Sequence, residues 1–232
     1  MRPVGVLGGM GPEATVLLMQ RIIAATPARD DADHIPLIVD QNPQVPSRIR
    51  HLIEGTGEDP APVLVGMARR LQAAGAQALA MPCNTAHHYA PSIRASVSVP
   101  LIDMVALSVA HAASLAPPGG IVGVLASPAV RLTGLFDQAL AASGLTALYA
   151  QDDDAVLPII RRIKAEGPVA EAHEALSRIS CELLARGAQV QMVACTEFSL
   201  IADAVAPGAV SFDTLDQLVK GIVAFSTKEV EA

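Results

Sequence analysis

Two halves of the chain carry the same short segments in the same order, and this internal repeat constrains the fold more than any other feature. The recurring segments, first copy with second, are Val4-Gly5-Val6-Leu7 with Val122-Gly123-Val124-Leu125, Gly75-Ala76-Gln77 with Gly187-Ala188-Gln189, and Leu101-Ile102-Asp103 with Ser211-Phe212-Asp213. In each copy a cysteine, Cys83 or Cys195, follows the glycine of Gly-Ala-Gln by eight residues. We therefore predict a duplicated βαβα unit, and a pseudo-twofold relation between the halves would place these cysteines on opposite sides of one cleft.

Short apolar runs alternate with longer helical patterns along the chain. Apolar strands without polar alternation are typical of parallel sheets covered on both faces. Helices are expected to start at Asp59-Pro60 and Ser127-Pro128 and to stop at Gly75 and Gly187. Strands are expected at residues 4–7, 35–39, 78–81, 101–102, 121–125, 147–149, 190–193 and 210–212. The pattern predicts an α/β fold with functional loops beyond the carboxyl ends of the strands.

Composition excludes several classes of protein. The formal net charge is −7, aromatic residues make up 3% and Trp is missing, which argues against nucleic-acid binding. Three cysteines do not suit a secreted disulfide framework. The longest charge-free stretch, residues 104–130, is broken by Pro117-Pro118-Gly119-Gly120, and the N-terminus lacks a signal-peptide pattern. We expect a soluble, cytoplasmic protein without a membrane or nucleic-acid partner.

The two repeated cysteines each stand between a strand and a helix. The surrounding segments are Met81-Pro82-Cys83-Asn84-Thr85-Ala86 and Val193-Ala194-Cys195-Thr196-Glu197. Free N–H groups at a helix N-terminus bind carboxylates and should lower the pKa of both thiols. A thiol on each side of a carboxylate site suits inversion at a carbon acid, because one base removes the α-proton while the other donates from the opposite face. This chemistry needs no cofactor and no metal.

Other roles for the cysteines remain open but explain less. Cys181, within an expected helix, is predicted to be a core residue. A zinc site from Cys83, His87 and Cys195 lacks the usual ligand spacing. A Cys-His nucleophile from Cys83 with His87 or His88 leaves Cys195 unexplained, and we expect at least one of these histidines to be exposed.

A glycine loop follows the first strand. The segment Gly8-Gly9-Met10-Gly11-Pro12-Glu13-Ala14 satisfies the dinucleotide fingerprint G-x-G-x-x-A, which makes a nicotinamide-dependent oxidoreductase the main alternative. Pro12 inside the fingerprint and the late position of Asp40 weaken that interpretation. The loop is otherwise a tight strand-to-helix turn, or Met10 and the loop N–H groups line a small carboxylate site.

Two basic residues are candidates for holding substrate. Arg48 ends the proline-rich loop Asn42-Pro43-Gln44-Val45-Pro46-Ser47-Arg48 and could clamp a carboxylate in bidentate fashion. Arg50 is its less favoured neighbour. Lys164 stands at the end of an expected helix, where a cation opposite the helix dipole is the ordinary explanation.

These motifs together resemble the aspartate/glutamate racemase family, especially its aspartate racemase branch. The resemblance rests on Gly8-Gly9-Met10-Gly11-Pro12, on the loop ending at Arg48, on Pro82-Cys83-Asn84-Thr85-Ala86-His87 and on Cys195-Thr196-Glu197. It implies two pseudo-symmetric α/β domains, each a mostly parallel sheet flanked by helices, with the active site in the cleft between them. It also implies that the last strand and helix return to the first domain, which gives domains at residues 1–101 plus 210–232 and at 102–209.

The resemblance assigns roles to residues as well. It makes Cys83 and Cys195 the acid/base pair of a cofactor-independent racemase, usually a homodimer. It makes Arg48 and Lys164 the residues that bind the substrate's carboxylates. Further carboxylate ligands implied are Asn84, Thr85, Ala86 and Thr196.

We therefore expect racemisation of an acidic amino acid, aspartate first and glutamate second, because Arg48 and Lys164 carry more positive charge than one carboxylate needs. Another carbon acid within the same family, the nicotinamide enzyme and a non-catalytic dicarboxylate-binding module are the alternatives.

Overall fold

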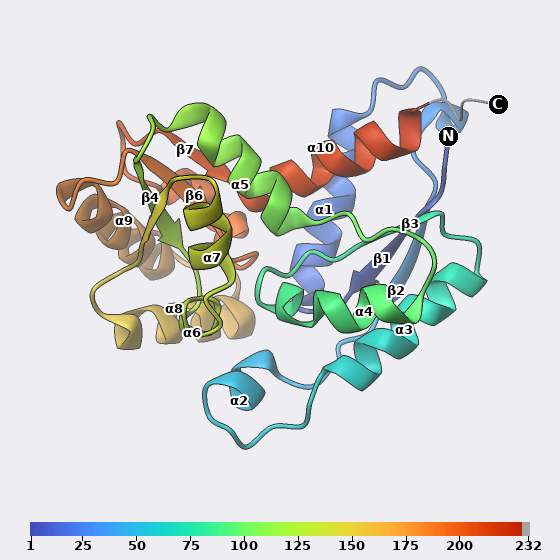
Figure 1. Ribbon diagram of the computed structural model, residues 1–232, viewed down its shortest axis with the longest axis horizontal. Coiled ribbons are helices and arrows are strands. Elements are labelled where there is room, and N and C mark those ends of the chain that lie inside the picture. The colour runs from blue at the N-terminus through green and yellow to red at the C-terminus, as the bar shows by residue number, and fades with distance from the viewer. Residues whose placement is uncertain (229–232) are drawn as a thin grey trace. The chain divides into compact units, whose positions relative to one another are not determined.

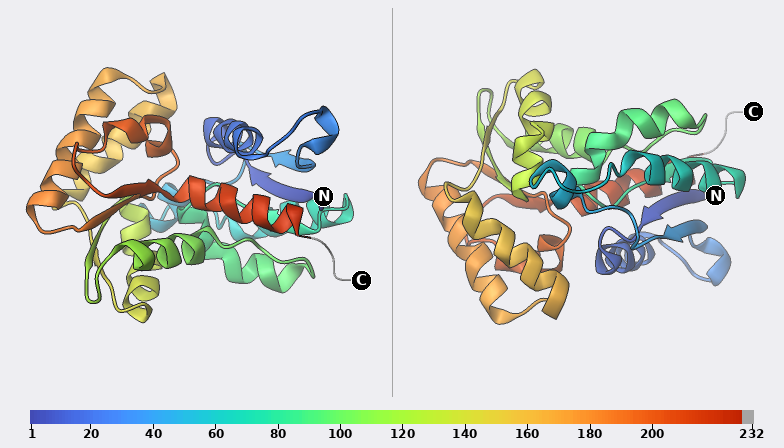
Figure 2. Two further views of the ribbon diagram at one scale, coloured as in Figure 1. Left: turned by 90° about the horizontal axis from the view of Figure 1, so that it is seen from above. Right: turned by 90° about the horizontal axis from the view of Figure 1, so that it is seen from below.

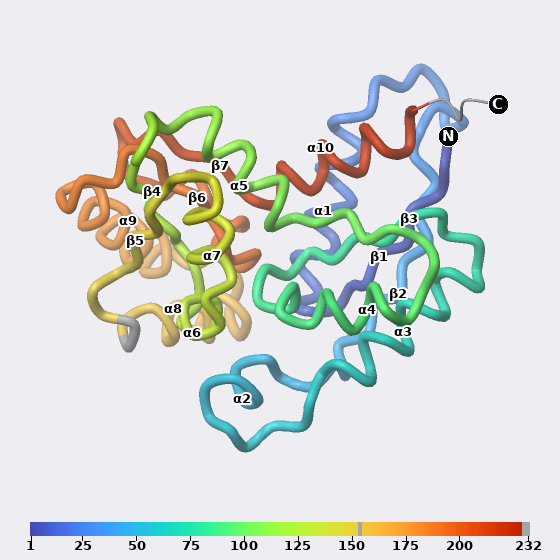
Figure 3. The backbone as a smooth tube through the Cα atoms, viewed as in Figure 1, coloured from blue at the N-terminus to red at the C-terminus, as the bar shows by residue number. Residues whose placement is uncertain are grey.

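The chain folds into two compact α/β units. The computed structural model describes residues 1–228, apart from the side chains of residues 153 and 154 (Figure 3). Met1–Met104 together with Leu215–Ala232 form the first unit, and Val105–Thr214 form the second. Each unit contains one parallel sheet with helices beside it, which confirms the predicted fold class (Figure 1).

The first unit is built on a three-stranded sheet in the order β2-β1-β3. Helices α3 and α4 pack on one face, and α1 and α10 pack on the other (Figure 2). Its elements are β1 (Val4–Gly8), α1 (Pro12–Ala25), η1 (Asp31–Asp33), β2 (Leu37–Gln41), α2 (Arg48–Leu52), α3 (Ala61–Ala73), β3 (Ala78–Ala80), η2 (Thr85–Tyr89), α4 (Ala90–Ser96) and α10 (Thr214–Thr227).

The second unit repeats this layering around a four-stranded sheet in the order β5-β4-β6-β7. Helices α8 and α9 pack on one face, and α5, α6 and α7 pack on the other. Its elements are α5 (Met104–Leu115), β4 (Ile121–Leu125), α6 (Pro128–Leu132), α7 (Leu135–Ala142), β5 (Thr146–Leu148), α8 (Asp153–Glu166), α9 (Ala170–Ala185), β6 (Val190–Val193), η3 (Phe198–Ala204) and β7 (Ser211–Asp213).

The first strand of each unit, β1 or β4, is apolar along its whole length and packs against helices on both faces of its sheet. Side chains alternate across a strand, so Val4 and Val6 enter the cluster with α1 and α10 while Leu7 enters the cluster with α3 and α4. In β4, Val124 and Leu125 divide in the same way between the two faces of the second sheet.

The repeated Gly-Ala-Gln segment makes the same helix-to-strand turn in both units. Gly75 after α3 has φ +99° and Gly187 after α9 has φ +94°, left-handed conformations that favour glycine. The backbone N–H of Gln77 then donates to the carbonyl of Pro3 at 2.9 Å, and that of Gln189 donates to Ile121 at 2.9 Å. Each turn thus starts the parallel pairing of the strand that precedes a cysteine with the first strand of its unit.

The last strand does not return to the first domain as the resemblance implied. β7 pairs in parallel with β6, and Gln191 N–H donates to the Val210 carbonyl at 2.8 Å. The hydroxyl of Thr214 donates to the Val193 carbonyl at 2.9 Å. These bonds keep residues 211–213 in the second sheet, and only the helix that follows packs in the first unit.

The third strand of the first unit has one further parallel neighbour, and the long charge-free stretch is interrupted. The strand expected at residues 101–102 is an isolated bridge between Leu79 and Leu101. The charge-free stretch does contain a helix, α5, that ends before the proline-glycine segment. Across the described part of the chain, no helix has both the length and the apolar composition needed to cross a membrane.

Gly9 joins β1 to α1 at a point where two backbones touch. It has φ +91°, and a Cβ built on it would lie 2.4 Å from the backbone carbon of Asn42. Its N–H donates to the Thr15 hydroxyl at 2.9 Å. The glycine is therefore required by its conformation and by the neighbouring chain.

We predict that Gly9→Ala destabilises the protein more than Gly75→Ala does. Both sites have a left-handed backbone, which should cost a substituted residue about 1–2 kcal/mol. Gly75 has open space around its Cβ position, whereas Gly9 meets the Asn42 backbone, which should add about 1–3 kcal/mol. Urea unfolding of the two variants measures the difference, and equal losses would contradict the close approach.

Candidate active site

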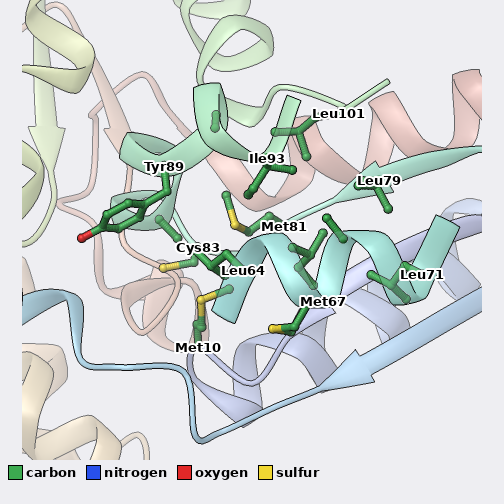
Figure 4. Packing of buried hydrophobic residues seen from close by; sticks show 14 of the residues in the cluster. Met10, Leu64, Met67, Leu71, Leu79, Met81, Cys83, Tyr89, Ile93 and Leu101 are labelled. Atoms are coloured by element: carbon green, nitrogen blue, oxygen red, sulfur yellow. The ribbon is translucent and has the colours of Figure 1, made fainter. Parts of the chain in front are cut away.

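Cys83 lies just past the end of β3, at the edge where the first sheet's strands finish. It is 7% exposed and shares a buried cluster with Met10 and Ala86. Figure 4 shows the Cys83 and Met10 side chains at the same end of this cluster. The structure therefore brings three of the expected site residues together within the first unit.

His87 fixes the backbone that carries Cys83. Its ring is buried; Nδ1 bonds to the Cys83 carbonyl at 2.9 Å and Nε2 accepts from the Met104 N–H at 3.3 Å. Because a carbonyl can only accept, these bonds assign the neutral tautomer with its proton on Nδ1. Burial lowers the pKa of His87, against smaller opposing effects of the Cys83 bond and Asp103.

The two ring bonds of His87 bear on the alternatives for Cys83. Both nitrogens face backbone groups, so neither is available as a base for the thiol or as a zinc ligand. His88 is exposed, as expected for at least one of the pair, and packs edge-on against the Tyr89 ring at 5.0 Å. Among the residues described, no group of three or more His, Cys, Asp or Glu could hold a metal.

Arg48 belongs to the surroundings of the first thiol. It opens α2 after the N-cap Ser47, and its Nη1 donates to the carbonyls of Pro46 at 3.1 Å and Val45 at 3.4 Å. The pKa of Tyr89 is raised to about 12, by burial first and then by Asp59, while Arg48 lowers it and Cys83 raises it. Val45, whose carbonyl Arg48 contacts, packs in the same buried cluster as Cys83. Asn84 and Thr85 follow Cys83, with Asn84 buried and Thr85 partly exposed.

Cys195 occupies the equivalent position past β6 in the second unit. The thiol is 6% exposed and donates to Glu197 Oε2 at 3.0 Å. The other oxygen of Glu197 pairs with Lys164 Nζ at 2.9 Å. Lys164 reaches it from the last turn of α8, and Thr196, which stands between Cys195 and Glu197 in the chain, is buried. The second unit thus contains a connected row of thiol, carboxylate and ammonium.

The prediction of a lowered pKa for the second thiol was wrong. The sequence predicted a lowered pKa, but burial raises the pKa of Cys195 well above its usual value, and the Glu197 charge and hydrogen bond raise it further. Lys164 opposes this effect without overcoming it. The helix that follows, η3, is a 3₁₀ helix that begins only at Phe198, and a desolvated thiol beside a carboxylate keeps its proton.

Glu197 is the site residue that sequence reasoning missed. Its only signal was its place in the segment Cys195-Thr196-Glu197, and that spacing does not tell whether the side chain turns back to the thiol. The position of Lys164 at a helix end likewise did not reveal its ion pair with Glu197.

Cys181 is exposed on α9, so its prediction as a core residue was wrong. Helical position alone had suggested burial beside Ile179 and Leu184, but the buried face of α9 is formed by its other apolar positions, Ala172, Ala175, Leu176 and Leu183.

The glycine loop is explained by contacts within the protein. A Cβ at Gly8 would lie 2.7 Å from Thr15, and Gly9 meets Asn42. Asp40, the acidic residue of the dinucleotide interpretation, accepts from Arg70 Nε and Nη2 at 3.0 and 2.8 Å. These contacts account for the fingerprint without a bound dinucleotide.

Fold and site together define the class of protein: an α/β enzyme with one cysteine after the equivalent strand of each repeated unit. The family described as Asp/Glu/Hydantoin racemase matches residues 7–221, and the chain belongs to this family. It is accordingly an isomerase, an amino-acid racemase.

Individual relatives agree over nearly the whole chain. It is 23% identical to the broad specificity amino-acid racemase RacX of Bacillus subtilis strain 168, over 95% of this chain and 96% of that protein. The structure of Picrophilus torridus aspartate racemase aligns with a TM-score of 0.88 and 22% identity, covering 100% of this chain and 96% of the other. An aspartate racemase homologue from Pyrococcus horikoshii aligns with a TM-score of 0.74 and 19% identity, covering 98% and 100%.

We predict that His87 makes stability fall as the pH falls. In the unfolded chain His87 titrates near its ordinary pKa of 6.5, and in the folded protein its pKa is lower. Between the two values the unfolded chain binds more protons, so the free energy of unfolding decreases from about pH 7 downward. Urea unfolding of wild type and His87→Gln at several pH values should show a flatter pH dependence in the variant.

The control is the exposed neighbour, in His88→Gln, which should keep the wild-type pH dependence. If His87→Gln keeps the full slope, the acid sensitivity arises elsewhere.

Proposed function

We propose that this protein interconverts the L and D forms of an acidic amino acid, aspartate first and glutamate second, by a cofactor-independent two-base mechanism with Cys83 and Cys195. The observation that carries the proposal is the equivalence of the two thiols. Each is buried, and each follows the strand that pairs with the first strand of its unit. A duplicated position for a thiol is what two faces of one carbon require.

In the proposed reaction one thiolate takes the α-proton and the opposite thiol donates its own proton to the other face. The α-carbon passes through a carbanion, whose charge spreads into the carboxylate. Donors around that carboxylate stabilise the transition state. We assign this role to the segment Asn84, Thr85 and Ala86 and to Thr196.

The proposed dicarboxylate specificity rests on two cations. Arg48 donates to the carbonyl of Val45, which packs in the cluster that contains Cys83, and Lys164 connects to Cys195 through Glu197. One α-carboxylate needs a single such partner, so the second cation favours a substrate with a side-chain carboxylate. The relatives range from an aspartate racemase to an amino-acid racemase of broad specificity, and the family name adds hydantoins. Another carbon acid of this family is the second candidate.

We also propose that the protein acts as a homodimer in the cytoplasm and that the two domains each supply one thiol to the active site. The resemblance to the racemase family supports these points.

We predict that Cys83→Ser and Cys195→Ser each lose racemase activity by about 1000-fold, because a hydroxyl is a poor base and general acid–base catalysis contributes about 100- to 10,000-fold. Proton NMR in D₂O with L-aspartate, L-glutamate and neutral amino acids follows loss of the α-proton, and chiral analysis follows the D product. Cys181→Ser, which changes the exposed third cysteine, is the matched control and should keep full activity.

Two outcomes would change the proposal. Full activity in either thiol variant would eliminate the two-base mechanism. Exchange of the α-proton by wild type without inversion would leave one working thiol and no second base.

We predict that Arg48→Leu affects dicarboxylates most. A charge-assisted hydrogen bond contributes about 1.5–3 kcal/mol, so KM for aspartate should rise about 10- to 100-fold. KM for alanine, if it is a substrate, should change much less. Arg50→Leu removes an exposed charge from the same helix and serves as the control. An equal loss for both substrates would mean that Arg48 does not contact the side-chain carboxylate.

A further inference from the structure

The two thiols differ in what surrounds them. Cys195 donates to a carboxylate, whereas the Cys83 thiol has no hydrogen-bond partner within the residues that the structure describes. The repeat places the thiols at equivalent points, but the glutamate is present only after the second: Cys195-Thr196-Glu197 corresponds to Cys83-Asn84-Thr85.

Glu197 is held where it faces the thiol. Its side chain is 11% exposed, and its two oxygens are divided between Cys195 Sγ at 3.0 Å and Lys164 Nζ at 2.9 Å. Lys164 is 37% exposed, so water screens it more than the buried thiol and carboxylate. A thiolate at Cys195 would therefore lie against a carboxylate of the same sign in a place with little water.

Within the residues that the structure describes, Lys164 is the one cation that acts against this repulsion. Lys164 on α8 is the cation that favours the Cys195 thiolate, and its effect is smaller than those of burial and Glu197. Asp213, buried at the end of β7, accepts from the Ser199 hydroxyl at 2.8 Å and brings no positive charge. The neighbouring apolar side chains of α8 and α9 increase desolvation.

We propose that Glu197 is a positioning residue that holds the proton on Cys195 in the substrate-free protein. The resting protein then uses Cys83 as the base and Cys195 as the acid for the one enantiomer whose α-hydrogen faces Cys83. This inference deepens the proposed racemase function and, for the order of the two thiols, rests on it.

The proton balance of one turnover shows what Glu197 would do. The substrate C–H proton goes to the Cys83 thiolate and the Cys195 proton goes to the opposite face of the carbon. The product leaves a Cys83 thiol and a Cys195 thiolate. One proton must then leave Cys83 to water and one must return to Cys195, and repulsion by Glu197 drives this reset.

The asymmetry is invisible in the specificity constants of the two directions. L and D enantiomers have equal free energies, so kcat/KM must be equal for both at every pH. A test of Glu197 must therefore observe the thiol itself, together with the pH dependence common to both directions.

We predict that Glu197→Gln makes the Cys195 thiolate form at lower pH, because a neutral amide no longer opposes the negative sulfur. The rate of alkylation by iodoacetamide is measured at each cysteine by peptide mass spectrometry across a pH series. The midpoint for Cys195 should fall by about one pH unit, with about a tenfold higher rate near neutral pH. The decrease of kcat/KM at alkaline pH should begin at a lower pH, by the same amount for L and D substrate.

Three comparisons make this result specific. Glu166→Gln removes an exposed carboxylate that pairs with Arg162 on α8 and should leave the Cys195 midpoint unchanged. Lys164→Met removes the opposing cation and should move the midpoint upward. The exposed Cys181 is the reference thiol within each sample.

An unchanged Cys195 midpoint in Glu197→Gln would overturn the inference. If iodoacetamide does not reach the thiol, the ultraviolet absorbance of the thiolate in a variant with Cys83 and Cys181 changed to Ser gives the same midpoint. If the Cys195 midpoint shifts but the wild-type protein exchanges no α-proton, the proposed racemisation is wrong. The effect of Glu197 on the protonation of Cys195 would still be established.

Discussion

Both units depend on one constraint, the parallel pairing that begins at the helix-to-strand turn. Left-handed glycines at 75 and 187 end α3 and α9, and the next backbone N–H groups bond to the chain entering β1 and β4. This registers β3 and β6 against their neighbours within a few residues of the two cysteines. The side chains of β1 and β4 are then buried between helices on both faces of each sheet, where close packing resists displacement.

The chemistry of each thiol is set by what its own unit places beside it. In the first unit the buried neutral His87 is hydrogen-bonded to the backbone of Cys83 and of Met104. The Cys83 thiol therefore has no histidine partner and packs among apolar groups, near the loop that leads to Arg48. In the second unit a carboxylate and an ammonium are connected to the thiol. Equivalent positions in a duplicated fold have thus acquired different electrostatics, and a two-base racemase can use such a difference to return its protons to the starting arrangement.

Much of the fold could be predicted from the sequence. Proline and glycine mark the ends of helices, and uninterrupted apolar runs indicate strands covered on both faces, so the α/β class and the equivalence of Cys83 and Cys195 followed from pattern alone. Three expectations failed for physical reasons. Helical position did not reveal that Cys181 faces outward, neighbouring residues did not reveal that Cys195 is desolvated beside Glu197, and strand composition did not reveal that residues 211–213 pair with β6.

The sequence by itself determined the repeat, the two thiols and the residue types near them, because these are properties of local order along the chain. The tertiary structure alone decided which side chains meet: Lys164 with Glu197, Glu197 with Cys195, and His87 with the backbone of Cys83 and Met104. Such pairs depend on the direction of each side chain and on how much water burial removes. Residue spacing does not determine either quantity, yet together they raise the pKa of the Cys195 thiol.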